Sequence, residues 1–241
     1  MIRYTLFDLD DTLYPPAAGL MQALGQRMIQ YMVEHLGMVP PQQAQTLRKA
    51  YNERYGSTTR GLVLHHDVDV VEFLAYAHDL PVEDYLKQDA DLGCLLDCLH
   101  VDKCVFTNAP QFYAERVLTV LGIADRFRKV FALEFSNYRG KPDPTTYERV
   151  VAHLGVGDRE LMLLDDSRIN LIPAAERGWT TVWVNGRREP AERIDYTVGD
   201  LWQVAHVFYE IGILDTTHRD EWHRCLAHCP LGERKSGEVS K

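Results

Sequence analysis

Three carboxylates follow an apolar run at the start of the chain. The run Ile2–Phe7 is rich in β-branched and aromatic residues, which is typical of a buried strand, and Asp8, Asp10 and Asp11 come directly after it. In open α/β sheets, ligands bind at the carboxyl ends of the strands. A carboxylate at such an edge can act as a nucleophile or as a proton donor. An exposed acidic turn is the alternative interpretation.

Three other polar groups stand at comparable points further along the chain. They are Thr107-Asn108 after the apolar residues 103–106, Lys141 in the glycine- and proline-containing loop 139–144, and Asp165-Asp166-Ser167 after the apolar residues 161–164. Taken singly, each could be a helix cap or a solvated lysine. Capping does not explain why all of them would lie at the same edge of one parallel sheet.

The residues between the first two apolar runs have helical spacing. We expect helices over residues 20–36, from Pro40 to about Tyr51, over 68–78 and over 91–99, with a loop at Tyr55–Gly61. Beyond residue 103 short apolar runs alternate with helical segments. The predicted strands are 103–106, 130–133, 161–164 and 180–184, and the predicted helices begin near Gln111 (with Tyr113 facing inward), Pro144, Arg168 and Asp200.

This order predicts an α/β fold: a Rossmann-like, three-layer parallel sheet with an inserted all-helical cap. We assign residues 1–15 and 100–215 to the core, 16–99 to the cap and 216–241 to a polar C-terminal tail. The tail contains His218, His223, Cys225, His228 and Cys229. We do not expect zinc there, because the flanking residues are polar and a second ligand cluster is missing.

Composition restricts the partners of the protein. The 241 residues are 46% hydrophobic and carry a formal net charge of -9, which argues against a nucleic-acid polymer or an anionic membrane as partner. We find no secretory signal and no apolar stretch long enough to span a membrane. The five scattered cysteines do not form a disulfide framework. We therefore expect a soluble cytoplasmic protein, and a small phosphorylated substrate remains compatible with the charge.

Four segments, in this order, resemble the motifs of the haloacid dehalogenase (HAD) superfamily. They are Asp8-Leu9-Asp10-Asp11-Thr12, Thr107-Asn108, Lys141-Pro142 and Asp165-Asp166-Ser167-Arg168-Ile169-Asn170. The position of the helical insertion matches the commonest cap position of that superfamily. Within the cap, Tyr55–Leu62 and the following His65-His66 are similar to the pyrimidine 5′-nucleotidase branch.

Chemistry and resemblance together give the motif residues roles in phosphate-ester hydrolysis. Asp8 would be the nucleophile that forms an aspartyl-phosphate, and Asp10 the acid that protonates the leaving oxygen and then activates water. Thr107 and Asn108, with backbone N–H groups, would hold phosphoryl oxygens, and Lys141 would neutralise the transferring group.

The crowded carboxylates imply a hard divalent cation, for which Mg²⁺ is the usual choice beside phosphate. By resemblance its ligands would be Asp8, the Asp10 carbonyl and Asp166, with Asp165 supporting the shell. Asn170 stands where many relatives carry an aspartate, so its part in the metal shell stays open.

The cap would supply specificity, through Arg60 and one of His65 and His66; a surface position is the alternative for each histidine. The leading prediction is a Mg²⁺-dependent phosphatase acting on a pyrimidine nucleoside 5′-monophosphate such as UMP or CMP. A broad-specificity sugar or cofactor phosphatase, a dehalogenase, a mutase and a catalytically silent binding protein are the alternatives. The sequence does not determine the oligomeric state.

Overall fold

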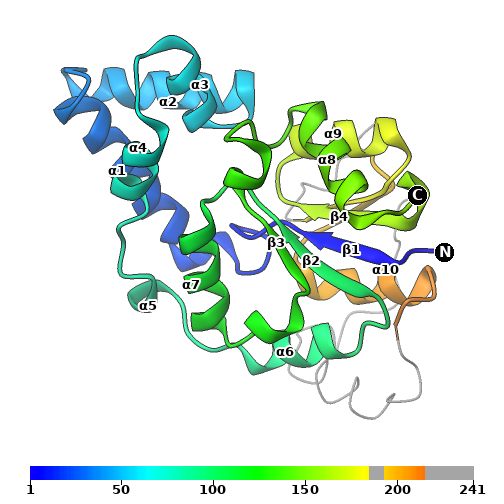
Figure 1. Ribbon diagram of the computed structural model, residues 1–241. Helices are drawn as coiled ribbons and strands as arrows, with labels where there is room; N and C mark the ends of the chain where they lie inside the picture. Colours follow the sequence, from blue (N-terminus) through cyan, green and yellow to red (C-terminus); the bar gives the residue numbers. More distant parts are fainter. Residues whose placement is uncertain (185–192, 215–241) are drawn as a thin grey trace.

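The computed structural model describes residues 1–184 and 193–214, and its centre is a parallel sheet of six strands (Figure 1). The strands are β1 (Tyr4–Phe7), β2 (Asp102–Phe106), β3 (Lys129–Phe131), β4 (Leu161–Asp165), β5 (Thr180–Val184) and β6 (Tyr196–Val198). Their order in the sheet is β3-β2-β1-β4-β5-β6, and every neighbouring pair is parallel. The predicted α/β class is confirmed.

Both faces of the sheet are buried, because successive side chains of a strand point to opposite faces. Leu6 of β1 packs in one apolar cluster with Tyr147 of α8 (Pro144–Leu154), whereas Phe7 packs in the other cluster with residues of α7 (Gln111–Leu121) and α10 (Val204–Glu210). This two-sided burial explains why the strands read as continuous apolar runs. α9 (Arg168–Arg177) packs beside β4 and β5 and completes the three layers.

The chain between β1 and β2 is helical, as predicted. Its helices are α1 (Leu20–Glu34), α2 (Pro41–Tyr55), α3 (Thr58–His65), α4 (Val70–Ala77), α5 (Val82–Tyr85) and α6 (Ala90–Asp97). The first four pack on one another and stand to one side of the sheet (Figure 1). α5 contacts α7, and α6 contacts the turn at Ala124–Arg126, so the chain returns along the core before it enters β2.

The structure corrects the predicted loop at Tyr55–Gly61. Gly56 ends α2 with a φ of 72°, and α3 begins two residues later. The hydroxyl of Ser57 caps α3 by accepting a hydrogen bond from the Arg60 N–H at 3.3 Å. Arg60 therefore lies on a helix and not in a loop, because a serine hydroxyl replaces the missing helical acceptor.

Other differences concern short elements and element ends. β6 and α5 were not predicted, and the third strand ends at Phe131 because Leu133 begins a helical turn. α4 starts at Val70 because the Asp69 carboxylate caps it. The histidine and cysteine cluster of the predicted tail lies outside the described residues. Across the residues that are described, no helix is long and apolar enough to cross a membrane.

Candidate active site

Lys141 lies at the centre of the site and is 1% exposed. Its Nζ donates hydrogen bonds to Asp8 Oδ1 at 2.8 Å and to Asp165 Oδ2 at 2.5 Å. A third goes to the carbonyl of Phe106 at the end of β2, at 2.6 Å. Burial lowers the pKa of Lys141, but the two carboxylates outweigh burial and raise the pKa above its ordinary value. The ammonium group is thus charged, and its three donors are satisfied.

Asp8 and Asp165 come to this lysine because β1 and β4 are neighbours in the sheet. Asp8 is the first residue after β1, and its N–H bonds to the Leu164 carbonyl at 2.8 Å. Asp165 is the last residue of β4 and is completely buried. Register alone brings the first and fourth motifs together.

Both carboxylate oxygens of Asp165 are hydrogen-bonded. Oδ1 accepts from the Ser167 N–H at 2.8 Å and from Asn170 Nδ2 at 3.0 Å. Oδ2 accepts from Lys141 and from the same Asn170 amide at 3.2 Å. Asp165 therefore orients its neighbours through both oxygens.

The second motif, Thr107-Asn108, fixes the backbone of Lys141 in the third motif. Asn108 Nδ2 donates to the Lys141 carbonyl at 2.8 Å, and Asn108 Oδ1 accepts from the Lys141 N–H at 2.7 Å. The adjacent Gly140 has a φ of 67°, and a Cβ there would lie 2.6 Å from Asn108 Oδ1. Thr107 Oγ1 accepts from the Ala109 N–H at 3.0 Å. The Asn108 side chain is thus committed to holding Lys141 in place.

Asp10 lies beside two tyrosines that the sequence did not identify as site residues. Its Oδ1 accepts hydrogen bonds from the hydroxyls of Tyr14, at 2.5 Å, and Tyr113, at 3.1 Å. Burial raises the pKa of Asp10 and exceeds the lowering effect of both hydrogen bonds. Tyr113 could be placed only on the inward face of a predicted helix, and nothing in the sequence distinguishes Tyr14 from a packing residue.

The donor set fits a hard divalent cation. Carboxylate oxygens of Asp8, Asp165 and Asp166 all lie within 4.8 Å of one another. Burial, followed by the nearby Asp165 and Asp8, raises the pKa of Asp166 to about 9, and burial raises that of Asp8 to about 8 despite Lys141. Asn170 Oδ1 is buried without a hydrogen-bond partner in the described chain. The negative charge of these clustered carboxylates is only partly balanced by Lys141. Such a group of oxygen ligands is suited to Mg²⁺.

The cap approaches this site at Gly56. A Cβ at Gly56 would lie 2.6 Å from Pro142 Cδ, so the turn before α3 rests on the residue after Lys141. The half-buried Arg60 side chain, in the first turn of α3, has no hydrogen bond or ion pair with any described residue.

The two cap histidines are bonded to tyrosines of α2. His65 Nε2 lies 2.6 Å from the Tyr55 hydroxyl, and His66 Nε2 lies 2.9 Å from the Tyr51 hydroxyl. His65 is exposed and His66 half-buried. These bonds link α2 to the end of α3.

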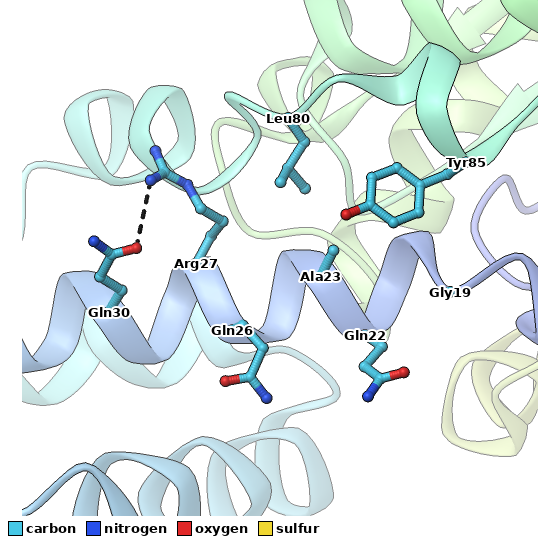
Figure 2. A pocket seen from close by; sticks show the side chains of 8 residues that line it. All are labelled: Gly19, Gln22, Ala23, Gln26, Arg27, Gln30, Leu80 and Tyr85. Atoms are coloured by element: carbon cyan, nitrogen blue, oxygen red, sulfur yellow. Dashed lines mark hydrogen bonds between the residues drawn. The ribbon is translucent and has the colours of Figure 1, made fainter.

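A cavity of about 510 Å³ opens beside α1 (Figure 2). Its lining residues are Gly19, Gln22, Ala23, Gln26, Arg27, Gln30, Leu80 and Tyr85. None of the residues predicted for catalysis, metal binding or substrate binding lines it. The chemistry therefore concentrates at the sheet edge and not in this cavity.

Known proteins resemble the chain over most of its length. The family model for haloacid dehalogenase-like hydrolases matches residues 2–178. "Phosphate metabolism protein 8" of Saccharomyces cerevisiae is 28% identical over 187 residues, which are 71% of this chain and 58% of that protein. The chain thus spans less than two thirds of that relative. A phosphoglycolate phosphatase of Neisseria meningitidis is 26% identical over 225 residues, covering 84% of this chain and 92% of that protein.

Solved structures share the fold. A HAD phosphatase from Thermococcus onnurineus has a TM-score of 0.57 at 22% identity, over 88% of this chain and 99% of that one. A 2-haloacid dehalogenase from Pseudomonas syringae has a TM-score of 0.54 at 22% identity, over 88% and 100%. Fold similarity therefore extends to proteins named for two chemistries. By the family match over residues 2–178, the chain belongs to the haloacid dehalogenase-like hydrolases.

Proposed function

We propose that the protein is a Mg²⁺-dependent phosphatase that hydrolyses small phosphate monoesters through a phosphorylated Asp8. The observation that carries this proposal is the placement of Asp8 against the buried Lys141 ammonium, with the oxygens of Asp165 and Asp166 within 4.8 Å. Relatives named as phosphatases of phosphoglycolate and of validoxylamine A 7′-phosphate support it.

The chain's own residues account for both half-reactions. An oxygen of Asp8 attacks phosphorus, and the bond from phosphorus to the leaving oxygen breaks as Asp10 gives that oxygen a proton. Water then attacks the aspartyl-phosphate, loses a proton to Asp10 and frees Asp8. Lys141, held by Asn108 and Asp165, balances charge on the transferring group. Mg²⁺, held by Asp8, Asp166 and the Asp10 carbonyl, would supply further charge neutralisation.

A dehalogenase also uses an aspartate nucleophile, but it needs neither a proton donor at Asp10 nor a cation. The carboxylate cluster around Asp166, together with the hydrogen-bonded Asp10, therefore favours phosphate chemistry. A silent binding protein would have no need for a buried lysine bridging two motif aspartates.

For the substrate, we propose a pyrimidine nucleoside 5′-monophosphate, UMP or CMP, with 2-phosphoglycolate as the second candidate. Support for the nucleotide is the Tyr55–Leu62 segment, because its Gly56 rests on Pro142 and its Arg60 side chain has no partner among the described residues. Support for phosphoglycolate is the relative in N. meningitidis, 92% of which is aligned. We assign substrate selection to the cap, residues 16–99, and place Arg60, His65 and His66 as candidate contacts.

We also propose a cytoplasmic location. Cys94 and Cys104 are free thiols, as in a reducing compartment.

The test is phosphate release from UMP, CMP, AMP, GMP, 2-phosphoglycolate and sugar phosphates, with Mg²⁺ and with EDTA. We expect turnover of UMP and CMP that EDTA abolishes, and Asp8→Asn should reduce it by at least about 10³-fold. Even turnover across the panel would leave a broad phosphatase and reject the nucleotide. Unchanged turnover in Asp8→Asn, with the variant melting like the wild type, would reject the mechanism.

A further inference from the structure

Two tyrosine hydroxyls converge on one oxygen of Asp10. Tyr14 comes from the loop after β1, and Tyr113 from the first turn of α7, 99 positions later in the chain. Their hydroxyls donate to Asp10 Oδ1 at 2.5 and 3.1 Å, and the two side chains are 3% and 1% exposed. Oδ2 of Asp10 accepts no hydrogen bond from residues 1–184 or 193–214. The carboxyl group is therefore held asymmetrically.

This asymmetry determines where a proton on Asp10 resides. A carboxyl oxygen has two lone pairs, and on Oδ1 both of them accept hydrogen bonds from the tyrosine hydroxyls. Oδ1 therefore has no lone pair left to carry a proton. Both hydroxyls are the donors in these bonds, because the acceptor is a carboxyl oxygen. A proton carried by Asp10 is consequently located on Oδ2, the oxygen without a partner among the described residues.

We propose that Tyr14 and Tyr113 are positioning residues that keep Oδ2 of Asp10 free to exchange the catalytic proton with the leaving oxygen and then with water. The proposal rests on the phosphatase function given above. When the bond between phosphorus and the leaving oxygen breaks, its electron pair stays with the leaving oxygen and the proton of Oδ2 joins it. In the second half-reaction, Oδ2 takes one proton from the attacking water, which restores the starting state.

The surroundings of Tyr113 hold its ring in place. The ring lies 4.8 Å from the imidazole of His78 at an angle of 67°, and its hydroxyl is directed at the loop after β1. A buried tyrosine hydroxyl also needs a partner for stability alone. The experiment must therefore read out proton donation separately from folding.

Leaving-group dependence provides that readout. An alkyl phosphate expels a strongly basic alkoxide and needs the proton, whereas p-nitrophenyl phosphate expels a stable anion and does not. Tyr113→Phe should lower kcat/KM, which reports the steps up to release of the leaving group, by about tenfold for UMP or for the best alkyl phosphate of the panel, corresponding to the loss of one hydrogen bond. For p-nitrophenyl phosphate kcat/KM should change less than about twofold, because proton donation contributes little to the departure of its leaving group. Tyr14→Phe should give the same pattern, and Asp10→Asn a larger one.

Tyr76→Phe is the matched control, because its hydroxyl bonds to Glu34 on the exposed side of the cap. It should leave both activities unchanged. Thermal melting with and without Mg²⁺ should show the same Mg²⁺-induced shift in Tyr113→Phe as in the wild type.

Equal losses of kcat/KM on the two ester classes, or none, in both tyrosine variants would overturn the positioning role, as would loss of the Mg²⁺ shift. The proposed function fails in a different way, through a wild type that is inactive or an active Asp8→Asn. The two failures are therefore distinguishable.

Discussion

At the scale of single residues, the Asn108 side chain positions Lys141 by binding its main chain. Its amide makes two hydrogen bonds, both to the main chain of Lys141, and each forms within 2.8 Å. Asn108→Ala would leave the Lys141 N–H and carbonyl unpaired in a region where the lysine is 1% exposed. We expect the free energy of unfolding to fall by about 2–3 kcal/mol. We expect kcat/KM to fall at least tenfold, because the ammonium group loses its fixed position.

Denaturant titration and steady-state kinetics measure these two effects. Asn52→Ala is the comparison, since Asn52 accepts one side-chain hydrogen bond, from Thr58 within the cap. Its cost should stay within about 1 kcal/mol, with activity unchanged. If Asn108→Ala lost affinity for phosphate esters at full kcat and full stability, direct phosphate binding by Asn108 would be the better explanation.

Residue types and order predicted the meeting of Asp8, Lys141 and Asp165, because the carboxyl ends of parallel strands share one edge. They could not predict that Tyr14 and Tyr113 bond to Asp10. That contact depends on how the first turn of α7 is rotated, and a buried tyrosine gives the same sequence pattern whether it packs or donates.

At the scale of elements, the turn between α2 and α3 is the contact of the cap with the Lys141 loop. Gly56 has a φ of 72°, and a Cβ there would lie 2.6 Å from the Pro142 ring. Gly56→Ala should cost about 1–2 kcal/mol for the left-handed backbone and about 1–3 kcal/mol for the steric overlap. Because relief of the overlap moves the cap from the Lys141 loop, kcat/KM should also fall, which assays below the melting temperature can measure.

Gly37→Ala separates the cost of the left-handed backbone from the cost of the steric overlap. Gly37 has a φ of 65°, and beyond its two chain neighbours no described residue has a heavy atom within 4 Å of the position of its Cβ. This variant should lose only the backbone part, about 1–2 kcal/mol, and keep its activity. If both substitutions changed stability and kcat/KM equally, the contact between Gly56 and Pro142 would contribute nothing to activity.

The sequence placed a loop at this turn because two glycines bound it, at Gly56 and Gly61. Gly61 instead lies inside α3, where a Cβ would lie 2.1 Å from the Tyr51 ring. Its absence of a side chain permits close helix packing and does not break the helix. β6 was not predicted for a different reason. At three residues it is too short to show the alternation of apolar and polar side chains that identifies a strand.

At the scale of the whole molecule, cap and core are joined through a buried histidine. His78 ends α4 and is 4% exposed, its Nδ1 lies 2.9 Å from the Leu74 carbonyl, and its ring packs on Phe112 and Tyr113 of α7. Burial lowers the pKa of His78 to about 4, although the hydrogen bond to Leu74 opposes this shift. The folded protein thus holds this junction together with a neutral imidazole.

That lowered pKa makes the junction sensitive to acid. Unfolding returns His78 to an ordinary pKa of about 6.5, so below that pH the unfolded chain binds the additional proton and stability falls as the pH decreases. Between about pH 7.5 and pH 5 this one group should remove about 2 kcal/mol from the free energy of unfolding. The buried carboxylates act in the opposite direction, because burial raises the pKa values of Asp8 and Asp166.

A difference between variants isolates the histidine from those carboxylates. His78→Gln retains a hydrogen-bond donor without a titration near neutrality. Urea titrations of both proteins at the two pH values should show the wild type losing about 2 kcal/mol more than the variant on acidification. Parallel losses in the two proteins would mean that the imidazole takes up its proton in the folded state and that the cap–core junction accommodates the charge. In that case acid would weaken the protein through other groups, and Tyr113 would keep its place beside His78 at low pH.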